Sequence, residues 1–234
     1  MNKILKWTLV SLCAVSPLLT QAQDSLTVEL QADVVNQNIW RGTNLGHISV
    51  QPEMAVSWKG LRLSAWGNIG LDSEDSREVD LTLSYETGGL SLGVVDYWTN
   101  DYDERYFYYK TPATGHAFEA FAGYDFGYFS MSWQTFFAGQ DFSEDDGKRT
   151  YSSYLQLTAP FRLAACDWEA TVGVVPWKAA YYSTNDFAVT NVSLGITKAI
   201  RITDSFSLPV FGRLIANPAE QHFYFVAGFT LKAF

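Results

Sequence analysis

The stretch "HFYFVAGFTLKAF" (222–234) alternates between large apolar side chains and smaller or polar ones. Successive side chains of a β-strand point to opposite faces, so the stretch predicts a strand with one apolar face. That face carries Phe223, Phe225, Ala227, Phe229, Leu231 and Ala233. The apolar set is unbroken, and what it contacts decides the fold.

The same two-residue period runs through most of the chain, with no convincing helical period after residue 22. Turn residues such as Lys59-Gly60 separate the alternating runs, as in β-hairpins. Twelve strands are predicted: 26–34, 47–58, 61–69, 78–86, 90–98, 116–125, 128–137, 150–159, 166–175, 187–197, 205–215 and 222–234. The pattern fixes this number to within two, because 99–116 and 160–166 read equally as strand or loop.

The connections between these strands alternate in character. One set is short or weakly charged: 59–60, 87–89, 126–127, 160–165 and 198–204. The other set is longer and mostly acidic: 70–77, 99–106, 139–149, 178–186 and 216–221. Short turns at one end and long loops at the other are typical of outer-membrane barrels. We therefore expect an all-β fold, a closed antiparallel up-and-down transmembrane β-barrel.

Alternation alone fits an exported soluble β-sandwich as well, since its apolar faces would point at each other. Small residues on the polar faces favour a narrow barrel interior. Several tryptophans are predicted near strand ends, where amphipathic rings meet lipid headgroups, although Trp66 and Trp133 lie nearer strand centres. Closure would also remove the two sheet edges. Phe234 ends the chain on an aromatic residue, as many outer-membrane proteins do, but it shares the register of Lys232.

Residues 1–22 have a charged start, an apolar run broken by Pro17 and a small residue at Ala22. This pattern predicts a secretory signal peptide followed by a barrel domain over 23–234. Loss of Lys3 and Lys6 takes the net charge from −9 to −11, which disfavours nucleic-acid binding. Cys166 would be the single remaining cysteine, so no internal disulfide is expected. The expected partners are outer-membrane lipid, small solutes or cations, and the barrel-assembly machinery.

An ordered set of motifs lies in the first third of the mature chain: Trp40-Arg41-Gly42, then Gln51-Pro52, then Trp58-Lys59-Gly60, then Trp66-Gly67. In this order the chain resembles a family of bacterial outer-membrane porins, the TorF-like or Gcw-type proteins. The resemblance implies an outer-membrane β-barrel and suggests passive transport. It supplies no catalytic residues, and we expect no cofactor.

Eight charged residues project inward on the predicted register: Glu29, Asp33, Glu53, Arg62, Asp80, Glu119, Glu169 and Arg213. They have two interpretations. They pair with one another into a plug, because an unpaired buried charge is costly, or they line a pore and select by charge. The main functional hypothesis is a porin or channel for passive diffusion of small solutes or cations. A non-conducting structural or adhesive barrel is the alternative.

A membrane phospholipase is a further alternative. His47 and Ser49 lie two residues apart on one predicted face, as a nucleophile and its base do in some outer-membrane enzymes, but that face is the interior one. The acidic loop around Asp141, Glu144, Asp145 and Asp146 departs from the EF-hand pattern, since Asp146 occupies the glycine position. Loose cation binding and a solvated loop both remain open there.

Overall fold

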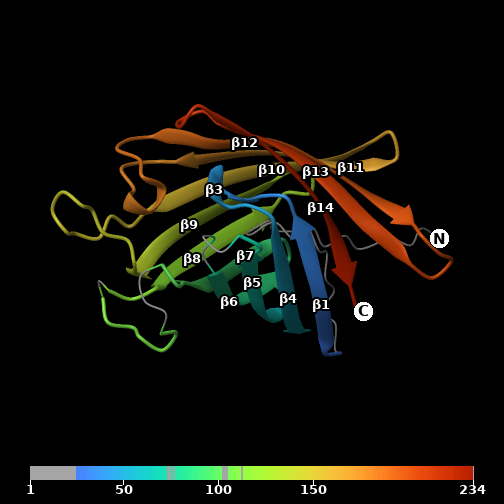
Figure 1. Cartoon of the computed structure of the whole chain (residues 1–234), viewed down its shortest axis with the longest axis horizontal. Coiled ribbons are helices and arrows are strands. Elements are labelled where there is room, and N and C mark those ends of the chain that lie inside the picture. Colours follow the sequence, from blue (N-terminus) through green and yellow to red (C-terminus); the bar gives the residue numbers. More distant parts are fainter. Residues whose placement is uncertain (1–24, 73–74, 76, 102–104, 112, 234) are drawn as a thin grey trace.

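The computed structural model describes residues 25–72, 75, 77–101, 105–111 and 113–233. Twelve strands in this part of the chain close into one antiparallel barrel, in which β1 pairs with both β4 and β14 (Figure 1). The predicted all-β closed barrel of twelve strands is confirmed. The predicted signal peptide over 1–22 and Phe234 lie outside the described residues.

The barrel is built from consecutive neighbours in the chain. Its strands are β1 (Thr27–Val35), β4 (Ser49–Trp58), β5 (Leu61–Gly70), β6 (Arg77–Thr87), β7 (Leu90–Thr99), β8 (His116–Asp125), β9 (Ser130–Gly139), β10 (Ser153–Leu163), β11 (Cys166–Val175), β12 (Ala188–Arg201), β13 (Ser207–Asn217) and β14 (His222–Lys232). A separate hairpin of β2 (Asn38–Trp40) and β3 (Thr43–Gly46) lies between β1 and β4. The short 3-10 helix η1 (Ala180–Tyr182) lies between β11 and β12.

The apolar faces of the strands point outward. On β5, Leu63 is 57% exposed whereas the inward Asn68 is 2% exposed. On β14, Phe225 is 54% exposed, and Val226 and Thr230 are buried. This arrangement is the inverse of a β-sandwich, whose apolar faces are buried between two layers. No helix within the described ranges is long and apolar enough to cross a membrane. The closed barrel is compatible with an outer-membrane protein.

The two ends of the barrel sheet meet where β1 pairs with β14. Their register runs from Gln31 opposite Lys232 to Val35 opposite Gly228. Asn36 then extends the pairing, because its backbone N–H and its side-chain amide donate to the carbonyls of Ala227 and Phe225 at 3.1 and 3.0 Å. Its Oδ1 accepts from the Ala227 amide at 2.7 Å. Through this pairing the first and last strands of the barrel sheet satisfy each other's backbone groups along the described seam.

The structure shifts several predicted boundaries. The strand predicted over 47–58 begins at Ser49, because His47 and Ile48 form a bend between β3 and β4. The segment 160–166 is mostly strand, since β10 and β11 meet in a two-residue turn at Ala164 and Ala165, both with positive φ. Within the described part of 99–116 no strand lies between the end of β7 and the start of β8.

Pro52 lacks a partner on one side only. It pairs with Ala32 of β1, whereas the β4–β5 pairing passes from Val50 opposite Ile69 directly to Glu53 opposite Trp66. A proline has no N–H to donate to the ladder, which accounts for the gap.

The long loops gather at one end of the barrel, and the short turns lie at the other (Figure 1). Because the strand number is even, β1 begins and β14 ends at the short-turn end. The hairpin formed by β2 and β3 starts from the long-loop end, and its turn residue Arg41 is buried inside the barrel. This inward hairpin positions the candidate site.

The exposed apolar surface predicts a depth-dependent cost for a charge. Leu83 lies near the middle of β6 and is 46% exposed, and Leu61 lies at the short-turn end of β5 with 45% exposed. In lipid vesicles we expect Leu83→Arg to lower the free energy of unfolding by about 2–4 kcal/mol, and Leu61→Arg by about 0–1 kcal/mol. Urea unfolding followed by tryptophan fluorescence measures both. Equal costs at the two positions would contradict a bilayer around these strands.

Candidate functional site

The turn of the β2–β3 hairpin is fixed against the barrel wall. Gly42 has φ +89°, and a Cβ at this position would lie 1.8 Å from the carbonyl oxygen of Thr190 on β12. On β13 the side-chain amide of Asn217 donates to the Gly42 carbonyl at 3.1 Å. Only glycine combines this backbone conformation with so close an approach. The hairpin therefore docks on the strands of the C-terminal half.

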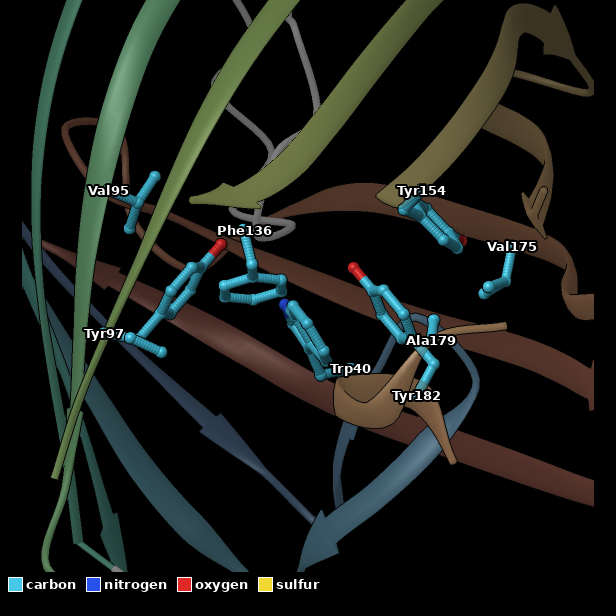
Figure 2. Close-up of a cluster of buried hydrophobic side chains, with 9 residues drawn as sticks. Trp40, Val95, Tyr97, Phe136, Tyr154, Val175, Ala179 and Tyr182 are labelled. Atoms are coloured by element: carbon cyan, nitrogen blue, oxygen red, sulfur yellow. The ribbon is translucent and has the colours of Figure 1, made fainter. Parts of the chain in front are cut away.

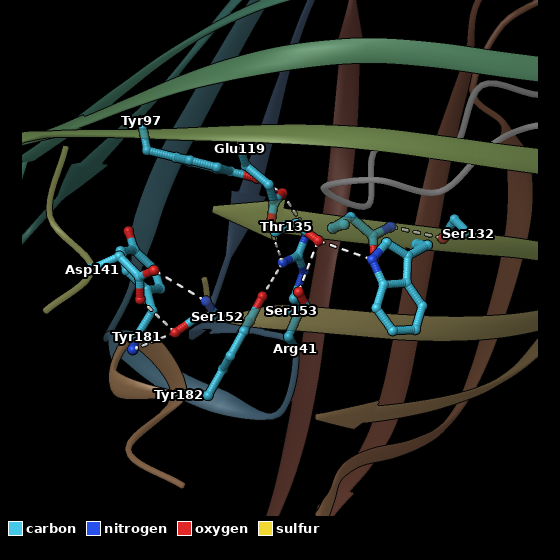
Figure 3. A network of polar contacts seen from close by, with 12 residues as sticks. Arg41, Tyr97, Glu119, Ser132, Thr135, Asp141, Ser152, Ser153, Tyr181 and Tyr182 are labelled. Atoms are coloured by element: carbon cyan, nitrogen blue, oxygen red, sulfur yellow. Dashed lines mark hydrogen bonds and ion pairs between the residues drawn. The ribbon is translucent and has the colours of Figure 1, made fainter. Parts of the chain in front are cut away.

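Arg41, beside this glycine, makes a buried ion pair with Glu119 of β8. Its Nη1 and Nη2 donate to the two carboxylate oxygens at 2.6 and 2.8 Å (Figure 3). The two side chains are 3% and 0% exposed. The Tyr97 hydroxyl donates to Glu119 at 2.9 Å, and the Tyr182 hydroxyl accepts from Arg41. Two parallel contacts between planar groups fix distance and orientation together, so the ion pair ties the hairpin to the opposite wall.

Aromatic rings surround the guanidinium. Its Cζ lies 4.4 Å from the ring centroid of Trp40 and 4.7 Å from that of Tyr154. Trp40 also stacks on Tyr182, with centroids 5.6 Å apart and planes at 10° (Figure 2). Tyr182 comes from η1, so two separate loops meet inside the barrel. This cluster is the larger of two buried apolar clusters among the described residues, and it lies within the lumen.

Electrostatics keep the ion pair charged. Burial opposes the charge on Arg41, but Glu119 opposite it stabilises the cation, and together with Tyr182 and Tyr97 raises the pKa of Arg41 well above its usual value. Burial raises the pKa of the Tyr182 phenol well above its usual value. The guanidinium is therefore charged and the phenol neutral across the physiological range. A modest pH change does not break this contact from the arginine side.

The loop end holds a cavity of about 590 Å³, and a smaller cavity of about 70 Å³ lies among the strands. Trp40 lines both cavities, so the hairpin forms their shared wall. The larger cavity is strongly acidic. Its charged lining comprises Glu78, Asp101, Asp141, Glu144, Asp145 and Lys178.

The eight charges predicted to project inward fall into three groups. At the short-turn half, Arg62 donates to Glu29 at 2.7 Å and to Glu53 at 3.0 Å. The smaller cavity is lined by Asp33, Glu169 and Arg213. The third group is Asp80 and Glu119. The structure therefore brings three of the eight together as an ion-paired cluster and separates the others along the interior.

Asp80 stands out among these charges. It is 3% exposed, and neither carboxylate oxygen has a hydrogen-bond partner in the described part of the chain. Its cross-strand neighbour Trp66 has a buried indole N–H that also lacks a partner. Groups of this kind usually contact water or an ion.

Sequence reasoning missed the anchor of the β7–β8 loop. His116 is fully buried, its Nδ1 lies 2.8 Å from the Asp96 carboxylate and its Nε2 lies 2.5 Å from the Tyr106 carbonyl. The carbonyl only accepts, so Nε2 carries a proton. Tyr109 stacks on the imidazole, with centroids 4.2 Å apart. The sequence shows His116 as an isolated histidine, because Tyr106 and Tyr109 come from an irregular loop.

The residues of the two alternative sites are engaged elsewhere. The ring of His47 contacts Asp75 at 3.1 Å, whereas Ser49 is 1% exposed and accepts from Gln51 at 3.3 Å. The structure does not join His47 and Ser49 as a nucleophile and its base.

In the acidic loop, Asp141 is 2% exposed and accepts from Thr150 and Ser152, and Ser152 in turn accepts from the Tyr181 amide (Figure 3). Asp141 thus holds η1 in place. Asp145 pairs with Lys178, and hydrogen bonds from the Lys148 amide and ammonium lower the pKa of Asp146. In the described ranges no three histidine, cysteine or acidic side chains are grouped to hold a metal ion.

The motif residues lie in three places, one of which is the β4–β5 turn with Trp58, Lys59 and Gly60. Trp40, Arg41 and Gly42 form the inward turn, as described above. Gln51 and Pro52 lie at the gap in the β4–β5 pairing, opposite Gly67 and Asn68, and Gln51 donates to Asn68 across it at 3.2 Å. Trp66 borders the gap, where it pairs with Glu53.

The buried ion pair predicts an asymmetric mutational response. We expect Glu119→Ala to lower the free energy of unfolding by about 3–5 kcal/mol, because it leaves the Arg41 charge buried without a partner. The double replacement Arg41→Met, Glu119→Leu should recover most of that loss. Glu29→Ala is the matched control, since Glu29 is 37% exposed and its contact with Arg62 should be worth under about 1 kcal/mol. Urea titration of the refolded barrel measures all three, and equal losses for Glu119→Ala and Glu29→Ala would contradict the assignment.

No family model matches the chain, and no curated protein sequence matches it.

Proposed function

We propose that the protein is an outer-membrane channel of the porin type, which passes small cationic or neutral solutes through the barrel interior. The observation that carries this proposal is the acidic cavity at the loop end. Five carboxylates and one lysine line it, and the fold around it is a closed twelve-stranded barrel with apolar strands facing outward. Rings of like charge in a pore select ions of the opposite sign.

The inward hairpin would be the constriction of such a channel. Arg41 and Glu119 lie between the two cavities, and the surrounding rings fill the lumen at that level. Passage of a solute then requires the hairpin or η1 to move. We therefore expect small conductance steps rather than the large ones of an open porin.

A non-conducting barrel with a structural or adhesive role is the second candidate. The filled lumen favours it, because the same aromatic core and ion pair make a good plug. We propose no enzymatic role, since Ser49 is buried inside the barrel and not on the lipid-facing surface where a phospholipase needs it.

The resemblance to TorF-like porins agrees with the channel hypothesis, and we propose that relationship on the motif residues alone. Residence in the outer membrane, with its lipid and its barrel-assembly machinery as partners, is part of the same proposal. The outward apolar side chains support this location, because contact of such a surface with water is unfavourable and lipid tails would cover it.

Planar-bilayer recording of the refolded protein tests the channel. We expect discrete steps and a reversal potential that favours cations under a salt gradient. Asp80→Asn should reduce this preference, because it removes an unpartnered carboxylate from the interior. Glu53→Gln should also reduce it, though by less, since Arg62 already balances Glu53. Glu220→Gln, which removes the same charge from an exposed position, should leave the preference for cations unchanged.

Three outcomes would count against the channel. An unchanged reversal potential in both interior variants would remove the role of these charges. Electrical silence, including in the Arg41→Met, Glu119→Leu variant that lacks the ion pair, would favour the structural barrel. Release of lysophospholipid from vesicles would favour an enzyme.

A further inference from the structure

Glu78 is a buried carboxylate that faces the large cavity without a counterion. It lies on β6, is 9% exposed and lines the cavity. In the part of the chain that the structure describes, its side chain has neither an ion pair nor a hydrogen bond. Its charged neighbour across the cavity lining is Asp101, which is another acid. A carboxylate removed from water and placed beside a like charge is stabilised by a cation.

The wall beside Glu78 is aromatic. Trp40, Tyr97 and Tyr181 all line the same cavity. Trp40 and Tyr97 are 7% and 2% exposed, and the buried indole N–H of Trp40 has no partner among the described residues. Aromatic faces attract cations, and most strongly where water is excluded. The cavity thus combines a buried carboxyl group that has no hydrogen-bond partner among the described residues with aromatic rings in its lining.

The protein already holds one of its own cationic side chains between a carboxylate and aromatic rings. Next to Trp40, which lines the cavity, the guanidinium of Arg41 contacts the carboxylate of Glu119 and the rings of Trp40 and Tyr154. The cavity offers the same two kinds of group, a carboxylate and aromatic rings. Glu78 takes the part that Glu119 has in the contact with Arg41. Among the described residues of the cavity lining the basic one is Lys178, and it is paired with Asp145 and not with Glu78.

The size of the cavity selects among cations. About 590 Å³ far exceeds the volume of a metal ion and lies in the range of small-molecule sites. The described acids are not grouped to coordinate a metal. An organic cation fits both facts, since its charged end reaches Glu78 and its apolar body contacts the rings.

From these observations we infer that the loop-end cavity is a binding site for a small organic cation, an amine or guanidine with an apolar body, anchored by Glu78. The inference rests on the proposed channel function and names its substrate class. The acidic loop residues Glu144 and Asp145 at the cavity would raise the local concentration of such a cation. Asp101 would add a second, more exposed carboxylate.

Isothermal titration of the full chain, refolded in detergent micelles, tests the site. The probe is benzylamine at neutral pH, with benzyl alcohol and benzoate as neutral and anionic analogues, each corrected for a micelle blank. We expect saturable binding of benzylamine and binding at least about tenfold weaker for both analogues. Glu78→Gln should weaken benzylamine binding by about ten- to a hundredfold, and Asp101→Asn by less. The matched control Glu220→Gln, an exposed acid outside the cavity, should change it by less than about twofold.

Equal binding of benzyl alcohol, or unchanged affinity in both Glu78→Gln and Asp101→Asn, would overturn the inference. So would displacement of benzylamine by magnesium or potassium chloride at concentrations below that of the probe, because the site would then be an inorganic-ion site. Isothermal titration does not require the barrel to conduct, so the channel and the organic-cation site can be refuted independently. Binding in an electrically silent barrel refutes only the channel, and conduction without benzylamine binding refutes only this site.

Discussion

The ion pair between Arg41 and Glu119 determines how the interior of the barrel is filled and divided. Without it, the hairpin would leave a guanidinium among aromatic rings with no carboxylate, and burial of an unpaired charge is strongly unfavourable. With it, the hairpin crosses the lumen, Trp40 separates two cavities, and Tyr182 brings η1 to the same point. A twelve-stranded sheet closed on itself would otherwise enclose an interior of polar strand residues. The filled lumen at the hairpin and the acidic cavity at the loop end both depend on this contact.

The outer surface of the barrel is largely apolar, whereas many inward positions hold small residues. Small residues occupy inward positions at which large rings also point into the interior. A Cβ on Gly93 would lie 2.4 Å from the ring of Phe121, and one on Gly173 would lie 1.7 Å from the Tyr154 hydroxyl. Small residues thus make room for the few inward aromatic rings.

Most of the strand framework could be predicted from the sequence, because a period of two residues is a local signal that each strand carries by itself. The register of Phe223, Phe225 and Leu231 predicted the outward face of β14 correctly. The inward hairpin was not predicted, since β2 and β3 are only three and four residues long and show no sustained alternation. Glu78 was missed for a different reason. Its lack of a partner depends on Asp101 and on a cavity formed by distant loops, and a strand pattern carries no information on either.

The docking of the hairpin turn links the two halves of the chain in time as well as in space. Gly42 follows the first strand, yet its contacts, Thr190 and Asn217, belong to β12 and β13, and Asn36 bonds to β14. The hairpin turn therefore docks fully only when β12 and β13 are in place, because these contacts join residues that are very distant in the chain. Such contacts form late, because a long loop must close first. The seam and the plug would then be completed in one step, and an intermediate that lacks its C-terminal strands would be both open-edged and hollow.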